Sequence, residues 1–362
     1  MDVTKIVITG GPCAGKSTAF SRIQEEFTTM GYKVLFVSET ATELINGGVA
    51  PWTCKTSDEF QTYLMKLQLE KEKIFYESAS SMSCEKVLIV CDRGMLDNKA
   101  YMSSSAFQVA LSELGLNETE LRDNYDAVFH LVTAANGAEE FYTLANNTAR
   151  TEKPEEARLI DEKLISSWTG HPHLRVIDNS TSFDDKIKRL IKEIATFLGE
   201  PEPLEIERKY LIEYPNISWL DSQKNCQRVE IIQTYLKSNA NEEIRVRQRG
   251  DNNGNFIYFK TIKRKLSDLK RVEIERRLSK DEYLTLLLEA DTEKRQIRKT
   301  RYCLMFESQY LEIDVYPFWN DKAILEIELS DENAQVSFPS EIKVIKEVTD
   351  DESYKNASLA KI

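Results

Sequence analysis

The octapeptide Gly10-Gly11-Pro12-Cys13-Ala14-Gly15-Lys16-Ser17 lies between an apolar run at residues 5–9 and a segment with helical periodicity at residues 17–30. It fits the pattern G-x-x-x-x-G-K-[ST], in which glycines allow main-chain N–H groups to turn towards phosphate oxygens. In this pattern the lysine contacts the terminal phosphates and the serine hydroxyl binds Mg²⁺. The strand–loop–helix context therefore predicts a site for GTP or ATP with Mg²⁺, formed by Gly10 to Ser17 and the adjacent Thr18.

The first half of the chain alternates short β-rich runs with longer helical patterns, which is typical of a parallel sheet flanked by helices. Strands are expected at residues 5–9, 33–37, 86–91, 127–132 and 175–177. Helices are expected at residues 17–30, 57–80, 154–167 and 184–198, where apolar residues recur every three or four positions. We therefore predict an α/β P-loop nucleotide-binding domain over residues 1–198.

Acidic residues follow two of the predicted strands. Asp92 ends the run 86–91, where it would face Mg²⁺ together with Ser17, although a strand-end Asp also caps a following helix. Glu39 follows the run 33–37 and is a candidate general base, with a helix N-terminal acid as the equal alternative.

A basic residue is expected in a lid over the phosphates. Arg150 is the third candidate catalytic residue, because an arginine there neutralises charge on a transferring phosphoryl group. Arg158 and Asp161 are expected to form an ordinary surface pair at i,i+3.

Several segments of the first half together resemble one family. They are the octapeptide, Asp92-Arg93-Gly94, Ala149-Arg150-Thr-Glu152 and Gly170-His-Pro-His-Leu-Arg-Val-Ile-Asp178. They look like the ATPase or kinase domain of ribosylnicotinamide-kinase-like proteins and of the TRPL translocation defect protein 14 group. The resemblance covers nearly the whole N-terminal half.

Two prolines and a glycine at residues 199–203 mark a linker, after which the apolar period changes from about 3.6 to 2. Strands are expected at residues 204–212, 227–236, 244–248, 256–261, 270–277, 301–307, 310–315 and 325–329. A helix is expected at residues 280–289. This pattern predicts an α+β antiparallel β-barrel domain over residues 204–362.

Charged residues occupy alternate positions on most of these strands, so they share one face. A solvated face explains any single strand, but five such strands favour a polar bore with metal on an acidic wall and phosphate on a basic wall. The predicted ligands of Mg²⁺ or Mn²⁺ are Glu205, Glu207, Glu273, Glu275, Glu312, Asp314, Glu326 and Glu328. The predicted phosphate-binding residues are Lys209, Arg245, Arg247, Arg249, Lys260, Arg277 and Arg301.

Glu205-x-Glu207-x-Lys209, the charged strands after it and the C-terminal stretch to residue 360 resemble the CYTH, or triphosphate tunnel, family. Its members include triphosphatases, thiamine-triphosphate enzymes and adenylyl cyclases, which hold Mg²⁺ or Mn²⁺ on glutamates. The two-domain order resembles the TRPL translocation defect protein 14 group as a whole. That likeness implies a GTP-binding and phosphoinositide-binding factor in membrane trafficking. The alternative is a bifunctional enzyme, a nucleoside-like small-molecule kinase joined to a metal-dependent triphosphatase.

Composition restricts the partners. A net charge of −12 argues against a general nucleic-acid binder. No apolar run approaches the length of about 20 residues needed to cross a bilayer, so we expect a cytoplasmic protein whose membrane contact, if any, is peripheral. The six cysteines are widely scattered and are expected to be reduced thiols.

Overall fold

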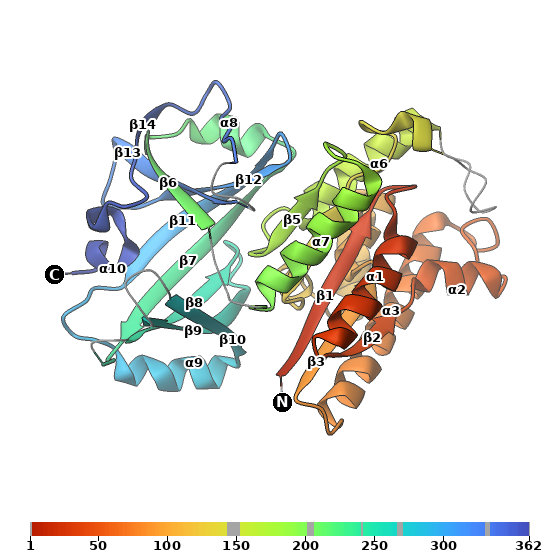
Figure 1. Ribbon diagram of the computed structural model, residues 1–362, viewed down its shortest axis with the longest axis horizontal. Coiled ribbons are helices and arrows are strands. Elements are labelled where there is room, and N and C mark those ends of the chain that lie inside the picture. Colours follow the sequence, from red (N-terminus) through yellow and green to blue (C-terminus); the bar gives the residue numbers. More distant parts are fainter. Residues whose placement is uncertain are drawn as a thin grey trace. The chain divides into compact units, whose positions relative to one another are not determined.

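The computed structural model describes residues 2–142, 153–200, 206–239, 242–265, 271–329 and 334–361, apart from a few side chains within these ranges, such as 271–274. The chain divides into two compact units, Met1–Glu193 and Ile194–Ile362, which we describe separately (Figure 1). Within the described residues, no helix combines the length and the apolar character needed to cross a membrane.

The first unit is a parallel sheet of five strands with helices packed around it (Figure 1). The strands are β1 (Asp2–Gly10), β2 (Lys33–Val37), β3 (Lys86–Asp92), β4 (Ala127–Leu131) and β5 (Leu174–Ile177), in the order β2-β3-β1-β4-β5. The helices are α1 (Lys16–Thr29), α2 (Thr40–Asn46), α3 (Ser57–Ser80), α4 (Ser104–Leu114), α5 (Glu118–Arg122), α6 (Pro154–Trp168) and α7 (Phe183–Phe197). This confirms the predicted α/β class. The short helices α2, α4 and α5 were not predicted.

The strand order explains where a site forms in this unit. β1 is central, with β3 and β4 as parallel neighbours, and both neighbours are almost fully buried. In a parallel sheet the carboxyl ends of the strands meet at one edge, where ligands usually bind. The octapeptide after β1 therefore lies beside the residues that follow β3 and β4.

The second unit is one antiparallel sheet of nine strands in the order β10-β9-β8-β7-β11-β12-β13-β6-β14. The strands are β6 (Ile206–Glu213), β7 (Cys226–Leu236), β8 (Glu242–Gly250), β9 (Phe256–Lys265), β10 (Arg271–Leu278), β11 (Ile297–Phe306), β12 (Gln309–Val315), β13 (Lys322–Leu329) and β14 (Val344–Glu347). The helices are α8 (Ile217–Ser222), α9 (Lys280–Leu286) and α10 (Asn356–Leu359). All eight predicted strands are present with shifted ends, and β14 was not predicted.

The two faces of this sheet differ. One face is apolar and carries a cluster around Tyr302, Ile313 and Leu325, together with a second cluster around Val246 that packs on α9. The other face carries the alternating charges. Leu211 on β6 packs in one cluster with Tyr235 on β7 although β11, β12 and β13 separate these two strands, so the sheet curls around its charged face. We call the concave space inside this curl the bore.

This unit confirms the predicted antiparallel, tunnel-like domain. Within the described residues, the end strands β10 and β14 are not hydrogen-bonded to each other, so no strand pairing joins the two edges of the curled sheet there. One end of the bore is filled by an apolar floor, a cluster in which Leu211, Tyr235, Ile297 and Ile324 pack with Tyr316 and residues of α10.

Candidate functional site

The phosphate-binding loop has the backbone conformation that its sequence requires. Gly15 and Cys13 have positive φ angles of 96° and 57°, a reversal that lets successive N–H groups converge on one point. α1 begins at Lys16, so its N-terminal N–H groups and dipole are directed to the same place. A Cβ at Gly15 would lie 2.5 Å from Cε2 of Phe183, so the glycine also permits close packing.

Asp92 lies beside this loop. It is the parallel-strand partner of Ile8, and its Oδ1 lies 3.7 Å from Lys16 Nζ. Burial raises the pKa of Asp92, Lys16 opposes that rise, and the charge of Glu39 adds to it. Oδ1 is buried and accepts no hydrogen bond from the described residues. A carboxylate oxygen without a hydrogen-bond partner beside the loop is a suitable ligand for Mg²⁺, together with the Ser17 hydroxyl. Binding of Mg²⁺ at this place remains a prediction.

Glu39 is held by an arginine that the sequence did not single out. Arg93 Nε donates to Glu39 Oε1 at 2.7 Å, and Thr42 Oγ1 donates to Oε2 at 2.6 Å. Burial alone would raise the pKa of Glu39, but the charges of Arg93 and Lys16 and these hydrogen bonds lower it to about 2. Glu39 is therefore ionised at neutral pH. Its role as a general base remains a prediction, as does the role of Arg150, which lies outside the described residues.

Asp161 differs from the expectation of a surface pair with Arg158. Its side chain is 5 % exposed, and Oδ1 accepts hydrogen bonds from Gly11 N at 2.8 Å and Thr133 N at 3.2 Å. His130 Nε2 lies 3.0 Å from the same oxygen. Arg158 instead donates to Ala135 O and pairs with Glu139. The sequence could not reveal this, because 150 positions separate Asp161 from Gly11.

The acidic wall of the bore is formed by β6, β12 and β13. Lys209 Nζ lies 2.7 Å from Glu326 Oε1 and 3.2 Å from Glu207 Oε1. Arg301 contacts Asp314 at 2.7 Å and Glu326 at 2.6 Å, and it also pairs with Glu312. These contacts bring together four of the eight predicted acidic residues, and they place Lys209 and Arg301, which were predicted to bind phosphate on the basic wall, in ion pairs on the acidic one. Lys299, which was not predicted, pairs with the fully buried Asp314.

The basic wall is formed mainly by β8. Arg245, Arg247 and Arg249 are the register partners of Tyr235, Gln233 and Ile231 on β7, so all three arginines face the bore. The nearest carboxylate oxygen of Glu275 on β10 lies 4.0 Å from Arg247 Nη1. Arg277 shares this face, because Phe259 pairs with both Arg277 and Arg247.

Lys260 does not belong to this wall. It is the register partner of Val246, a core residue of the opposite face, so the structure places it outside the bore. Among the described side chains of β9, the lysine that faces the bore is Lys263, the partner of Glu243 on β8 and Glu273 on β10. Lys263 lies on the face of Arg245 because Thr261, two residues before it, pairs with Arg245, and this register cannot be read from the sequence of β9 alone.

Two carboxylates in the bore are placed to bind a divalent cation. Glu207 and Glu328 are directly opposed on β6 and β13. Burial and the charge of Glu326 raise the pKa of Glu207, whereas Lys209 and Lys263 lower it. Hard oxygen donors under like-charge repulsion fit Mg²⁺ or Mn²⁺. In the part of the chain that the structure describes, no group of three or more His, Cys, Asp or Glu side chains forms a complete metal site. Of the other predicted ligands, Glu205 and the side chain of Glu273 lie outside that part.

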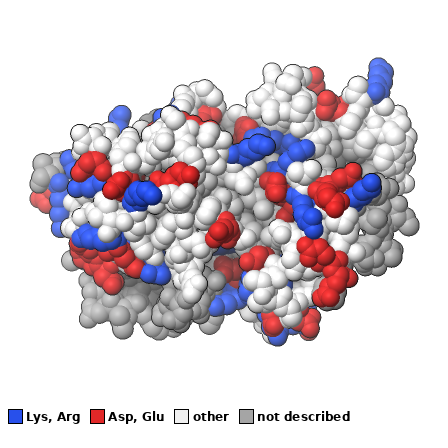
Figure 2. Space-filling view, turned by 90° about the horizontal axis from the view of Figure 1, so that it is seen from above, with Lys and Arg blue, Asp and Glu red and all other residues white. Residues whose placement is uncertain are grey.

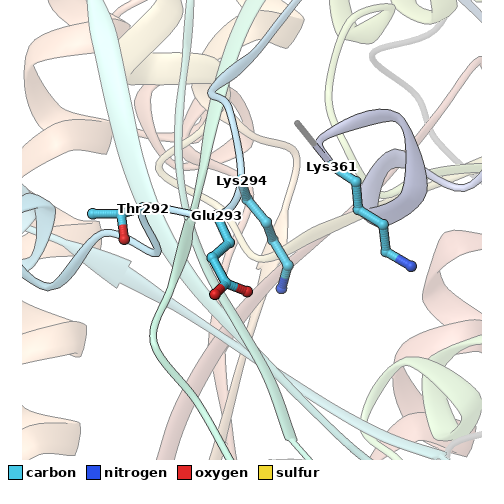
Figure 3. A pocket seen from close by; sticks show the side chains of 4 residues that line it. All are labelled: Thr292, Glu293, Lys294 and Lys361. Atoms are coloured by element: carbon cyan, nitrogen blue, oxygen red, sulfur yellow. The ribbon is translucent and has the colours of Figure 1, made fainter.

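The surface adds two observations. Among the described residues on the face shown in Figure 2, acidic and basic side chains are interspersed. A cavity of about 530 Å³ is lined by Thr292, Glu293, Lys294 and Lys361 (Figure 3). It includes none of the predicted site residues, and Lys294 already pairs with Asp291 at 3.3 Å.

Comparison with known proteins agrees with both units. Residues 5–186 match the AAA domain family and residues 203–352 match the CYTH domain family. The chain belongs to the AAA domain family and is an AAA-type P-loop domain fused to a CYTH domain. It is 31% identical over 159 residues to an inorganic triphosphatase of Nitrosomonas europaea. The matched region covers 43% of this chain and 96% of that protein.

Two solved structures are also similar. One is an inorganic triphosphatase, with 29% identity, coverage of 43% of this chain and 94% of that chain, and a TM-score of 0.30. The other is the deoxyadenosine kinase from M. mycoides with bound dATP, with 16% identity, coverage of 53% and 98%, and a TM-score of 0.37.

Proposed function

We propose that the CYTH domain hydrolyses linear triphosphates with a divalent cation, and that the P-loop domain uses a purine nucleotide to phosphorylate a small nucleoside-like acceptor. The proposal for the CYTH domain depends above all on one observation, a curled sheet whose charged face carries a row of arginines on β8 and a carboxylate cluster around Lys209 on β6 and β13. A linear triphosphate carries several negative charges along a thin chain, so it suits basic groups on one side and a bridging cation on the other.

In the bore, the chain's own residues would bind and orient the substrate. Arg245, Arg247 and Arg249 offer a row of guanidinium groups on alternate positions of one strand, suited to successive phosphates. Burial lowers the pKa of Lys209, but the charges of Glu326 and Glu207 raise it by more, so the pKa lies above its ordinary value. Lys209 therefore stays protonated and would neutralise one phosphoryl oxygen. Mg²⁺ or Mn²⁺, held by Glu207 and Glu328, would supply Lewis-acid polarisation of the reacting phosphate.

In the P-loop domain, Lys16 would contact the terminal phosphates, and Ser17 with Asp92 would hold Mg²⁺. Glu39 lies close enough to Lys16 for its pKa to respond to the lysine. Glu39 is paired with Arg93, so the two side chains would act side by side. Glu39 would accept the proton of an incoming hydroxyl, and Arg93 would supply a cation beside the reacting phosphate.

A GTP-binding and phosphoinositide-binding role in membrane trafficking is the other interpretation. The basic wall would suit clustered headgroup phosphates as well as a free triphosphate. We favour hydrolysis because the 31% identical relative is named an inorganic triphosphatase, whereas the comparisons give trafficking no support.

Assays with the full chain test both proposed activities. Phosphate release from tripolyphosphate, ATP and GTP should be measured with Mg²⁺, Mn²⁺ or EDTA, and phosphate transfer with a nucleoside panel. We expect metal-dependent tripolyphosphate hydrolysis that Glu207→Gln abolishes and Lys16→Ala leaves intact. The control variant is Glu341→Gln, because Glu341 is an exposed carboxylate of the same unit. Slow hydrolysis combined with tight binding to phosphoinositide vesicles would contradict the enzyme and support the trafficking role.

A further inference from the structure

Lys186, near the start of α7, contacts the main chain of the phosphate-binding loop. Its Nζ donates to the carbonyl oxygens of Ala14 at 3.2 Å and Val132 at 2.6 Å, and to Asn179 Oδ1 at 2.7 Å. The residue is 2 % exposed. An ammonium group has three protons and no acceptor, so these three bonds use its whole capacity.

This contact determines how one peptide group of the loop is oriented. In a trans peptide the C=O of one residue and the N–H of the next point in opposite directions. When Lys186 holds the Ala14 carbonyl outward, the N–H of Gly15 must point inward, to the concave side of the loop. Asp161 holds the other end of the loop through Gly11 N. Two buried charged side chains thus fix the loop at both ends.

We propose that Lys186 is a positioning residue for nucleotide binding, which holds the Gly15 N–H turned towards the phosphates through its bond to the Ala14 carbonyl. The proposal rests on nucleotide binding by the P-loop. It predicts that the loop loses its preorganised amide when the ammonium loses its proton, because a neutral amine has two protons for three acceptors and turns a lone pair towards one of them.

The protonation of Lys186 changes in an accessible range. Burial lowers the pKa of Lys186 to about 8. The charges of Asp161 on α6 and Asp178 after β5 oppose this shift, and the charge of Arg189 on α7 adds to it. Bound phosphates favour the ammonium form, so nucleotide binding and proton uptake are linked. Nucleotide affinity should therefore fall as the pH rises through about 8.

The experiment measures the Kd of fluorescent ATP and GTP analogues with Mg²⁺ on the full chain between pH 7 and 9.5. We expect Lys186→Met to bind about tenfold more weakly at pH 7, which corresponds to about 1.4 kcal/mol, and to lose the decrease at high pH. Lys186→Arg keeps a charged donor and should bind without that decrease. Lys188→Met is the matched control, because Lys188 is exposed and pairs only with Asp185 among the described residues.

Three results would overturn the proposal. They are unchanged affinity in Lys186→Met, a decrease at high pH that persists in that variant, and a wild-type affinity that stays constant to pH 9.5. The last result decides the question even if Lys186→Met does not fold. Failure of nucleotide binding itself looks different, because the wild type would then not bind at pH 7 and Lys16→Ala would change nothing.

Discussion

Glu207 on β6 and Lys263 on β9 interact across the bore, although β8, β7, β11, β12 and β13 lie between their strands in the sheet. Burial and Glu326 raise the pKa of Glu207, and the ammonium of Lys263 acts in the opposite direction, together with Lys209. A flat sheet would separate the two strands by roughly 28 Å, at about 4.7 Å for each strand step. This electrostatic influence agrees with the packing of Leu211 on β6 against Tyr235 on β7, which brings the two sides of the curled sheet together.

The face assignment of β9 leads to a matched pair of variants. Lys263→Met removes a cation from the bore, so tripolyphosphate should bind about tenfold more weakly. Lys260→Met changes the same residue type on the opposite face of the same strand and should alter affinity by less than about twofold. Isothermal titration calorimetry with a non-hydrolysable tripolyphosphate analogue measures both. Equal effects from the two variants would contradict the register argument.

Metal binding in the bore should depend on pH through Glu207. The folded pKa of this carboxyl is raised above 4.5. Metal needs the ionised form, so affinity for Mn²⁺ should be full at neutral pH and should fall as the pH drops towards that raised pKa. Glu207→Gln should bind Mn²⁺ weakly at every pH. Titrations between pH 4.5 and 7.5 that show identical pH profiles for variant and wild type would assign the metal to other residues.

The buried charges on β11 and β12 should make a large contribution to stability. Asp314→Ala leaves Lys299 and Arg301 without the carboxylate that both contact, which should destabilise the second unit by about 3 to 5 kcal/mol. Glu352→Ala breaks an exposed pair with Lys355 and should cost less than about 1 kcal/mol. Hydrogen exchange of amides in β11 to β13 reports the difference. Similar protection in both variants would mean that the buried network stabilises little.

Glu39 should stabilise the first unit only while it is ionised. Its folded pKa of about 2 lies below the ordinary value of 4.5. Such a depressed pKa contributes stability that is complete above about pH 4.5 and is lost as the pH falls towards 2. The difference in unfolding free energy between wild type and Glu39→Gln should therefore be constant from pH 5 to 7 and should shrink below 4.5. Urea unfolding at several pH values measures it, and a difference that grows on acidification would exclude the ion pair with Arg93 as its source.

The sequence predicted what depends on neighbours along the chain. The octapeptide ending in Lys16 and Ser17 is contiguous, and the alternation on β8 and β12 identified charged faces from each strand alone. What it missed depends on distant partners. Asp161 and Lys186 lie far from the loop in sequence, and no local pattern distinguishes them from surface residues. Lys260 was misplaced because its face follows from the pairing with Val246 rather than from residue type.

The apolar floor around Tyr235 and Leu211 also affects the charges next to it. Lys209 is two residues from Leu211 on β6, and Glu326 is two residues from Ile324 on β13, so each is adjacent to hydrocarbon on the floor side. Solvent dipoles can reorient around these groups from the remaining side only, and weaker screening lengthens the range over which each charge acts. Exchange of one floor residue for a polar one would admit water and weaken Coulomb interactions throughout the adjacent layer, without removing a single charged group.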